Sequence, residues 1–219
     1  VPEVNITVLN EDDRIIANQN CSTIQLLLVL WPLHQKYKLK RIVISTYQSV
    51  TGSGAKGTNQ LMCERKGIKT KAPAYPHQID LNCIPHAGNF MENNYTDEEM
   101  KLLNESRKIM AIQDLKVSAT AVRVPVLGGH SESVNIEFFS KPDVNEVKAI
   151  LDKAPGVKVL DNPSANSYPM PVLSEDKDET FVGRIREDLS CENAINLWIT
   201  ADNLRKGAAT NALQIAEYV

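Results

Sequence analysis

Apolar residues recur with a helical period near the start of the chain. Ile24, Leu27, Leu28 and Trp31 are three or four positions apart, a spacing that places their side chains on one face of a helix. The pattern predicts a helix over residues 21–38, and its apolar character predicts that this helix lies in the core.

Three further helices are predicted. Thr96 and Glu99 form the capping-box pattern, in which each side chain satisfies a backbone N–H of the other, and they predict a helix over 96–112. A third helix is expected over 143–153, and a last one over 204–218.

Segments rich in β-branched residues predict the strands. They are 14–17, 41–47, 78–84, 117–125, 131–139, 157–160, 180–187 and 195–201. The turn around Gly128 and Gly129 predicts that 117–125 and 131–139 pair with each other as an antiparallel hairpin. The glycine-rich segment 48–57 is predicted as a loop, and no regular element is expected over 58–78. Strands joined by short turns outnumber helices, so the fold class is α+β, with a largely antiparallel mixed sheet covered by helices.

Composition narrows the class of protein. The chain of 219 residues is 42% hydrophobic and 23% charged, as expected for a domain with a full core. Its net charge is −3 and its basic residues are scattered, which argues against a nucleic-acid partner. The sequence has no apolar run of about 18 residues, so no membrane span or membrane partner is expected.

The cysteines suggest a reducing compartment. Cys21, Cys63, Cys83 and Cys191 are widely spaced, which indicates free thiols and a cytoplasmic location. His77, Cys83 and His86 fall close together, but their spacing fits no zinc motif, so no metal site is predicted.

One cysteine stands where it could be reactive. Cys21 opens the first predicted helix, and the N–H groups of a helix N-terminus favour a thiolate, which lowers the pKa of the thiol. A buried structural thiol is the alternative, and the local sequence leaves both open. Further along, Arg123 and His130 lie seven residues apart and could bind a carboxylate and move a proton.

Several motifs then occur in one order. They are Asn20-Cys21-Ser22-Thr23, Ser45-Thr46-Tyr47-Gln48, Arg123-x-Pro125-Val126-x-x-Gly129-His130-Ser131-Glu132, Thr180-Phe181-Val182-Gly183-Arg184-Ile185-Arg186 and Asp202-Asn203-Leu204-x-Lys206-Gly207-Ala208-Ala209. With these motifs the chain resembles aspartate-semialdehyde dehydrogenase over almost its whole length. The resemblance implies a fold like the catalytic domain of glyceraldehyde-3-phosphate dehydrogenase-like enzymes. It also implies oxidation of L-aspartate 4-semialdehyde with phosphate and NADP to L-4-aspartyl phosphate, on the route to lysine (through diaminopimelate), threonine and methionine.

The resemblance assigns roles to matching positions. Cys21 would be the nucleophile that carries the thioester, His130 its acid/base partner, and Gln48 the residue that orients substrate. Arg123 would bind the substrate carboxylate and Glu98 its amino group, although Glu98 also fits as an acidic residue of the capping box. Three further assignments concern the phosphate and the cofactor: Lys101 would hold phosphate, and Thr51 and Gly52, together with Asn203, would contact NADP.

The resemblance is incomplete at its beginning. The family opens with a glycine-rich turn after a strand, which binds the dinucleotide, and no such turn precedes Cys21. Gly52, Gly54 and Gly57 also follow a predicted strand, but they lie beyond Cys21 and resemble the family's catalytic-domain loop, so they are not interpreted as the dinucleotide-binding turn. We therefore expect residues 1–20 to be a remnant of the cofactor-binding domain and 21–203 to be the catalytic and dimerisation domain. The helix over 204–219 would pack on the missing NADP-binding domain. The chain alone is expected to be an inactive homodimer.

Two other functions remain open. N-acetyl-gamma-glutamyl-phosphate reductase uses the same thiol chemistry, but Glu98, Lys101 and Arg123 suit a free amino acid better than an acetylated one. A non-catalytic dimerisation module is the second alternative, and the intact set of Cys21 and His130 argues against it.

Overall fold

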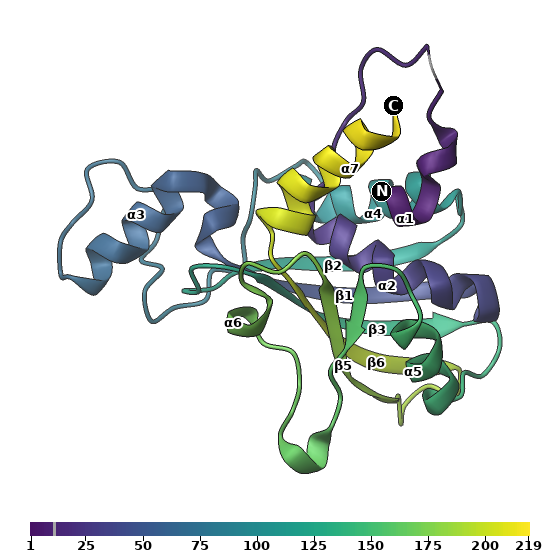
Figure 1. Ribbon diagram of the computed structural model, residues 1–219. Coiled ribbons are helices and arrows are strands. Elements are labelled where there is room, and N and C mark those ends of the chain that lie inside the picture. Colours follow the sequence, from purple (N-terminus) through teal and green to yellow (C-terminus); the bar gives the residue numbers. More distant parts are fainter. Residues whose placement is uncertain (11) are drawn as a thin grey trace.

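A single mixed sheet forms the centre of the computed structural model, which describes residues 1–10 and 12–219 (Figure 1). Among these residues six strands form one sheet in the order β2-β1-β3-β6-β5-β4. The strands are β1 (Leu39–Gln48), β2 (Lys116–Arg123), β3 (His130–Phe138), β4 (Val157–Val159), β5 (Thr180–Glu187) and β6 (Ala194–Ala201). The pairs β1/β2 and β4/β5 are parallel and the other three are antiparallel, so the predicted α+β class is confirmed.

The predicted hairpin of 117–125 with 131–139 is wrong, because β1 lies between β2 and β3. The chain that leaves β2 stays hydrogen-bonded to the end of β1: Val124 donates to the Gln48 carbonyl, and Val50 donates to the Val126 carbonyl. It therefore crosses the end of β1 before β3 begins, and β1 pairs on both of its edges.

One face of the sheet is covered by helices. α2 (Cys21–Tyr37) lies across the middle strands, with α4 (Asp97–Met110) beside it over β2 and α5 (Val144–Asp152) over β4 and β5 (Figure 1). The remaining helical elements are α1 (Pro2–Asn5), η1 (Ile6–Val8), η2 (Val50–Ser53), α3 (Gly54–Arg65), η3 (Pro163–Ala165), α6 (Pro171–Ser174), η4 (Arg205–Ala209) and α7 (Thr210–Tyr218). No helix in the described part of the chain is both long enough and apolar enough to span a bilayer.

Other sequence predictions fail outside the sheet. The predicted loop 48–57 and the unassigned residues after it contain η2 and α3. α3 has no apolar periodicity that would predict it, because Leu61 is its one large, fully buried apolar side chain. Residues 14–17 form no strand, and in 78–84 only Ile84 pairs, through a single bridge to Arg123.

The last predicted helix is present in two parts. η4 is a π-helix that contains Lys206 and Gly207, and α7 continues it as an α-helix, so the helical turn changes after Ala209. The Lys206 ammonium group is buried and lies 2.7 and 2.8 Å from the two carboxylate oxygens of Glu3. This ion pair ties the beginning of the chain to its end.

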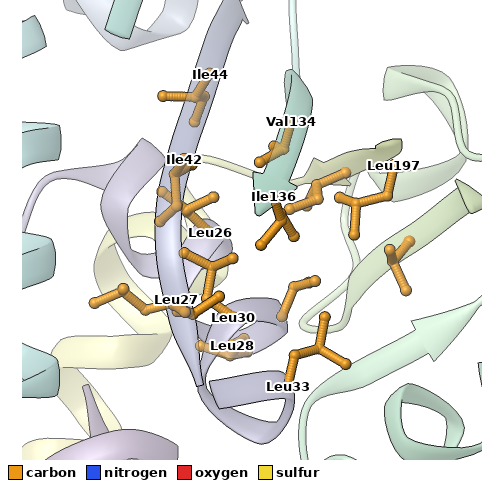
Figure 2. Close-up of a cluster of buried hydrophobic side chains, with 14 of the residues drawn as sticks. Leu26, Leu27, Leu28, Leu30, Leu33, Ile42, Ile44, Val134, Ile136 and Leu197 are labelled. Carbon is orange, nitrogen blue, oxygen red and sulfur yellow. The ribbon is translucent and has the colours of Figure 1, made fainter. Parts of the chain in front are cut away.

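The core lies between α2 and the sheet (Figure 2). It is built from Leu26, Leu27, Leu28, Leu30, Leu33, Ile42, Ile44, Val134, Ile136 and Leu197, all at most 2% exposed. Burying one leucine contributes about 1.5–3 kcal/mol, so this cluster is the main source of stability.

The opposite sheet face is more polar. Ser45, Asn135 and Asn196 lie on this face and are half-buried. The rings of Tyr47 and Trp198 pack together there, with their centroids 5.3 Å apart. Among the described residues the three helices that cover the sheet, α2, α4 and α5, lie on its other side (Figure 1).

Candidate active site

Cys21 is the first residue of α2, as the sequence predicts. Asn20 is the N-cap: its side-chain Oδ1 accepts hydrogen bonds from the backbone N–H groups of Ser22 and Thr23, at 3.0 and 3.3 Å. The cap holds the first turn in place, and with it the direction of the Cys21 side chain.

The same asparagine connects this turn to α4. Its Nδ2 donates to Glu98 Oε2 at 2.7 Å, and its backbone N–H donates to Glu105 Oε2 at 3.0 Å. The other Glu98 oxygen lies 2.6 Å from the Lys101 ammonium group. The structure therefore places Glu98 and Lys101 beside Cys21, as a pair of opposite charges.

Gln48 reaches the nucleophile from the end of β1. Its Nε2 donates to Ser22 Oγ at 3.3 Å and to Thr46 Oγ1 at 3.2 Å. The Gln48 Oε1 atom is buried and has no hydrogen-bond partner among the described residues. One half of the amide is thus fixed by the protein, and the other half has no partner in the described part of the chain.

Arg123 and His130 meet at Gly52. A Cβ atom at Gly52 would lie 2.5 Å from an Arg123 guanidinium nitrogen and 2.9 Å from His130 Nε2, so both side chains lie against the glycine backbone. Arg123 is 6% exposed and donates to the Ser49 carbonyl at 3.1 Å. No carboxylate of the described residues forms an ion pair with it, so the guanidinium is a buried cation without an anion.

Ser49 holds the other ring nitrogen of His130. The Ser49 backbone N–H donates to Nδ1 at 3.1 Å, and the Ser49 hydroxyl lies 3.0 Å from the same atom. The backbone N–H of Ser49 can donate only to an unprotonated Nδ1, and this bond puts the proton of the neutral ring on Nε2. In the other tautomer Nδ1–H would donate to the Ser49 hydroxyl, the backbone bond would be lost, and Nε2 could accept a proton. Nε2 is buried and has no partner among the described residues.

The loop after β6 closes the site. Asn203 Oδ1 accepts from the hydroxyl groups of Ser49 and Thr51, at 3.0 and 3.2 Å. Gly207 lies directly against the nucleophile, since a Cβ at that position would be 2.9 Å from the Cβ of Cys21. The predicted site residues therefore come together from five parts of the fold: the starts of α2 and α4, the end of β1, the β2–β3 region, and the loop before η4.

Burial keeps the histidine neutral. Burial, together with the positive charge of Arg123, lowers the pKa of His130 to about 3. At neutral pH the ring is therefore an uncharged imidazole, the form that can take a proton from a thiol.

The expected lowering of the pKa of Cys21 is wrong for this arrangement. Burial and the negative charge of Glu98 raise the pKa of the thiol to about 11, while Arg123 and the Ser22 backbone N–H act in the opposite direction. The first-turn N–H groups are in part taken by Asn20, so their effect on the thiol is smaller than the sequence suggested. Cys21 needs a base to become a thiolate at neutral pH.

A small cavity adjoins Arg123. It has a volume of about 210 Å³, and its lining includes Ser53, Tyr75, His86 and Asn89. This space is suited to a small molecule whose carboxylate would meet the guanidinium.

Sequence reasoning missed several residues of this site. The sequence motifs assign no role to Asn20, Ser49 or Gly207, although each contacts or orients a predicted site residue. For Asn20 a signal existed, because asparagine before an apolar helical run is a common N-cap. For Ser49 and Gly207 the signal is the fold itself, which brings distant segments together.

Comparison with known proteins agrees with this geometry. The family described as "Semialdehyde dehydrogenase, dimerisation domain" matches residues 30–206. Aspartate-semialdehyde dehydrogenases of Aquifex aeolicus and Bacillus subtilis are 50% and 46% identical to the chain over 99% of its length. The chain spans 66% of the length of each of these relatives.

Solved structures give the same result. The structure of aspartate semialdehyde dehydrogenase II complexed with ASA from Vibrio cholerae is 41% identical, with a TM-score of 0.93 over 100% of this chain and 66% of that one. The Candida albicans aspartate semialdehyde dehydrogenase with NADP is 26% identical, with a TM-score of 0.73 over 100% of this chain and 65% of that one. The chain belongs to the semialdehyde dehydrogenase dimerisation domain family.

Proposed function

We propose that this chain is the catalytic and dimerisation part of an NADP-dependent aspartate-semialdehyde dehydrogenase, located in the cytoplasm. The reaction converts L-aspartate 4-semialdehyde, phosphate and NADP+ to L-4-aspartyl phosphate, NADPH and a proton. The observation that carries the proposal is the buried Arg123 guanidinium, which lies beside Cys21 and His130 without a carboxylate partner among the described residues. A buried cation of this kind is costly unless an anion binds it, so it supports a substrate carboxylate at this point.

The charges around Cys21 match the substrate. Arg123 would bind its carboxylate, and the Glu98 carboxylate would bind its ammonium group. Lys101, paired with Glu98 at 2.6 Å and partly exposed, would bind the incoming phosphate. The carboxylate, the ammonium group and the phosphate ion would thus each be bound by one protein group.

Cys21 and His130 would perform the covalent chemistry. His130 Nε2 takes the thiol proton, and the sulfur attacks the aldehyde carbon to give a thiohemiacetal. The Cys21 amide and Gln48 would stabilise the developing oxyanion. Oxidation of this adduct to the thioester is the chemistry that NADP supplies when it is bound. Phosphate oxygen then attacks the thioester carbon, the C–S bond breaks, and Cys21 leaves as a thiolate that is reprotonated.

Part of the cofactor site is present. Thr51, Gly52 and Asn203 would contact the nicotinamide end, and the glycine backbone next to His130 gives a flat ring room to approach. The glycine-rich segment that leads from β1 into α3 (Gly52, Gly54 and Gly57) lies at the candidate site, with Gly52 against Arg123 and His130, so the pyrophosphate would be bound elsewhere. We infer that it is held by the part of the longer relatives that this chain does not match, and that the chain alone is inactive. In this division residues 1–20 and 204–219 belong beside the cofactor-binding part, and 21–203 form the catalytic domain.

The open sheet face would form the homodimer. It is half-buried in the single chain and carries Tyr47 and Trp198 between small polar side chains, and aromatic residues are enriched at the centres of interfaces. Sedimentation velocity at low micromolar concentration tests this: a dimer is expected, and a monomer of 24.3 kDa would contradict it.

The two alternatives are less favoured. An N-acetyl-gamma-glutamyl-phosphate reductase would need no anion for a free ammonium group, yet Glu98 lies beside Cys21, held by Asn20 and Lys101. A non-catalytic dimerisation module would need neither the buried Arg123 cation nor the free Nε2 of His130.

A chimera tests the proposal. The chain is joined to the unmatched N-terminal part of the Aquifex aeolicus relative, and oxidation of aspartate semialdehyde is followed with phosphate and NADP. We expect activity from the chimera, none from the chain alone, and none from the chimera carrying Cys21→Ser. A folded chimera without activity, or one that prefers an N-acetylated substrate, would overturn the assignment.

A further inference from the structure

A carboxyl group lies buried behind the candidate site, and the chemistry described above does not use it. Glu132 is on β3, two residues after His130, and its side chain is fully buried. In the sheet it pairs with Thr46 of β1 on one side and Ile199 of β6 on the other. Its neighbours on the same strand face, Val134 and Ile136, lie in the core against α2, so Glu132 faces α2 as well.

The surroundings of Glu132 contain no compensating cation. Within the described chain no lysine, arginine or histidine forms an ion pair with it, and its two oxygens lack a hydrogen bond of normal length. Burial raises the pKa of the carboxyl well above its ordinary value, and the nearby Gln25 amide opposes this in part. An isolated carboxylate would be very costly here, so the neutral acid is the stable form.

Every element packed on Glu132 can be named. α2 presents Gln25 and, one turn earlier, the Cys21 thiol; β1 presents Thr46, and β6 presents Ile199. Cys21 on α2 and His130, two residues earlier on the same face of β3, are the titratable groups that face Glu132 from these elements. A negative charge on Glu132 would raise the pKa of this thiol.

Glu132 therefore lies between the start of α2, which carries Cys21, and the end of β1, which carries Gln48. Gln25 is four residues after Cys21 and on the same side of α2. Thr46 accepts a hydrogen bond from Gln48, which also donates to Ser22. The first two turns of α2 and the end of β1 thus enclose the carboxyl group.

We propose that Glu132 is a positioning residue of this site: a neutral carboxylic acid that supports Gln25 on α2 and Thr46 on β1, and so keeps Cys21 and Gln48 in register. The proposal rests on the proposed function, because the alignment of Cys21 and Gln48 matters only if both take part in catalysis. The charge state and the packing of Glu132 can be tested without turnover. A neutral acid has one donor and one acceptor, which complement the amide of Gln25, whereas a carboxylate has acceptors only. As a neutral group it supports the nucleophile without opposing its ionisation.

The first test measures the charge state. We compare Tm of the chain and of Glu132→Gln from about pH 5 to about pH 8. The folded-state pKa is raised, so the stability that Glu132 contributes is complete below its unfolded value and is lost as pH rises toward the folded value. The Tm of Glu132→Gln should therefore exceed the Tm of the wild type by a margin that grows as pH rises. A variant that is less stable than the wild type at the upper pH would show an ionised, paired Glu132 and overturn the proposal.

The second test measures positioning through the rate of Cys21 alkylation by iodoacetamide. Glu132→Ala removes the support and admits water beneath the thiol, so alkylation should become severalfold faster at fixed pH. Glu132→Gln should restore the wild-type rate at neutral pH, whereas Glu132→Met, which fills a similar volume without a hydrogen-bond donor, should not. Glu137→Ala is the matched control, because it lies on β3 with its side chain bonded to Lys40 on the exposed side. Equal rates in the wild type and Glu132→Ala would exclude a positioning role.

Activity of the chimera separates this inference from the proposed function. If the chimera is active, Glu132→Ala should lower kcat by about tenfold with little change in KM, and Glu132→Gln should restore most of it. If the wild-type chimera is inactive, the proposed function fails, and the Tm and alkylation results still decide the role of Glu132.

Discussion

The two ends of α2 differ in what they bury. Its second half buries Leu26, Leu30 and Leu33 in the core, with all three fully buried. Its first turns bury Ser22, Thr23 and Gln25, and the Thr23 hydroxyl has no hydrogen-bond partner among the described residues. An unsatisfied buried polar group costs about 1–3 kcal/mol, so the first turns lower stability while the second half supplies it.

This difference indicates how the helix is used. The leucine half anchors α2 to the sheet, and that anchor fixes the position of the polar half, which carries Cys21. The polar half is unfavourable for folding but forms the surroundings of a reactive thiol, as expected where a site is built at the expense of local stability.

Breaking the anchor should have the largest effect. Leu30→Ala removes a fully buried side chain and should lower the free energy of unfolding by about 2–5 kcal/mol, because it loses burial and leaves a cavity. Urea denaturation measures it. Leu213→Ala, at a position 61% exposed, is the control and should change stability by less than about 0.5 kcal/mol. Equal effects of the two substitutions would show that α2 is not the anchor.

The next effect concerns the polar half and its partner across the site. Arg123→Gln removes the buried guanidinium, and in the active chimera kcat/KM should fall by an amount equivalent to roughly 1.5–3 kcal/mol, the usual value of a hydrogen bond to a charged group. Arg41→Gln, at an exposed position of β1, is the control. Unchanged kcat/KM in Arg123→Gln would mean that the substrate carboxylate binds elsewhere.

A smaller effect is expected at the cap. Asn20→Ala loses the acceptor for the Ser22 and Thr23 N–H groups and should cost about 1 kcal/mol of stability. Asn20→Asp keeps this acceptor and should recover most of the loss in urea denaturation. Should both variants be equally unstable, the bond from Asn20 to Glu98, and not the cap, would be the stabilising contact.

The smallest expected effect concerns the charges that set the pKa of Cys21 in the polar half of α2. Glu98 raises the pKa of Cys21, so Glu98→Gln should lower it from about 11 and speed alkylation at any pH below that value. Arg123 lowers the same pKa, so Arg123→Gln should slow alkylation. The exposed Cys83 serves as an internal reference in the same mass spectra. A slower reaction of Cys21 in Glu98→Gln would contradict the sign.

The sequence predicted the leucine half of α2 better than its surroundings. Helical spacing in 21–38 and β-branched runs such as 41–47 are local patterns, and the structure has α2 and β1 there. The order of the strands is not local: β3 is separated from β2 because Val124 and Val126 stay bonded to β1, and no pattern in the turn shows this.

The site shows the same limit. The motif around Cys21 and that around His130 could be recognised from the chain, and the fold brings both to Gly52 and Gly207. The raised pKa of Cys21 could not be predicted, because it depends on burial and on Glu98, which is 77 residues away in sequence and beside the thiol in space. The local sequence shows only that Cys21 stands at a helix N-terminus, and that position lowers the pKa of a thiol.

The central claim is that the polar end of α2 carries a thiol that forms an acyl-enzyme with an aspartate derivative. Peptide mass spectrometry of the chimera, incubated with aspartate semialdehyde and NADP in the absence of phosphate, tests it most directly. The account predicts an aspartyl group on the peptide that contains Cys21, lost when phosphate is added and much reduced in Arg123→Gln. An adduct on Cys63, Cys83 or Cys191 in place of Cys21, or no adduct in a chimera that is otherwise active, would contradict it.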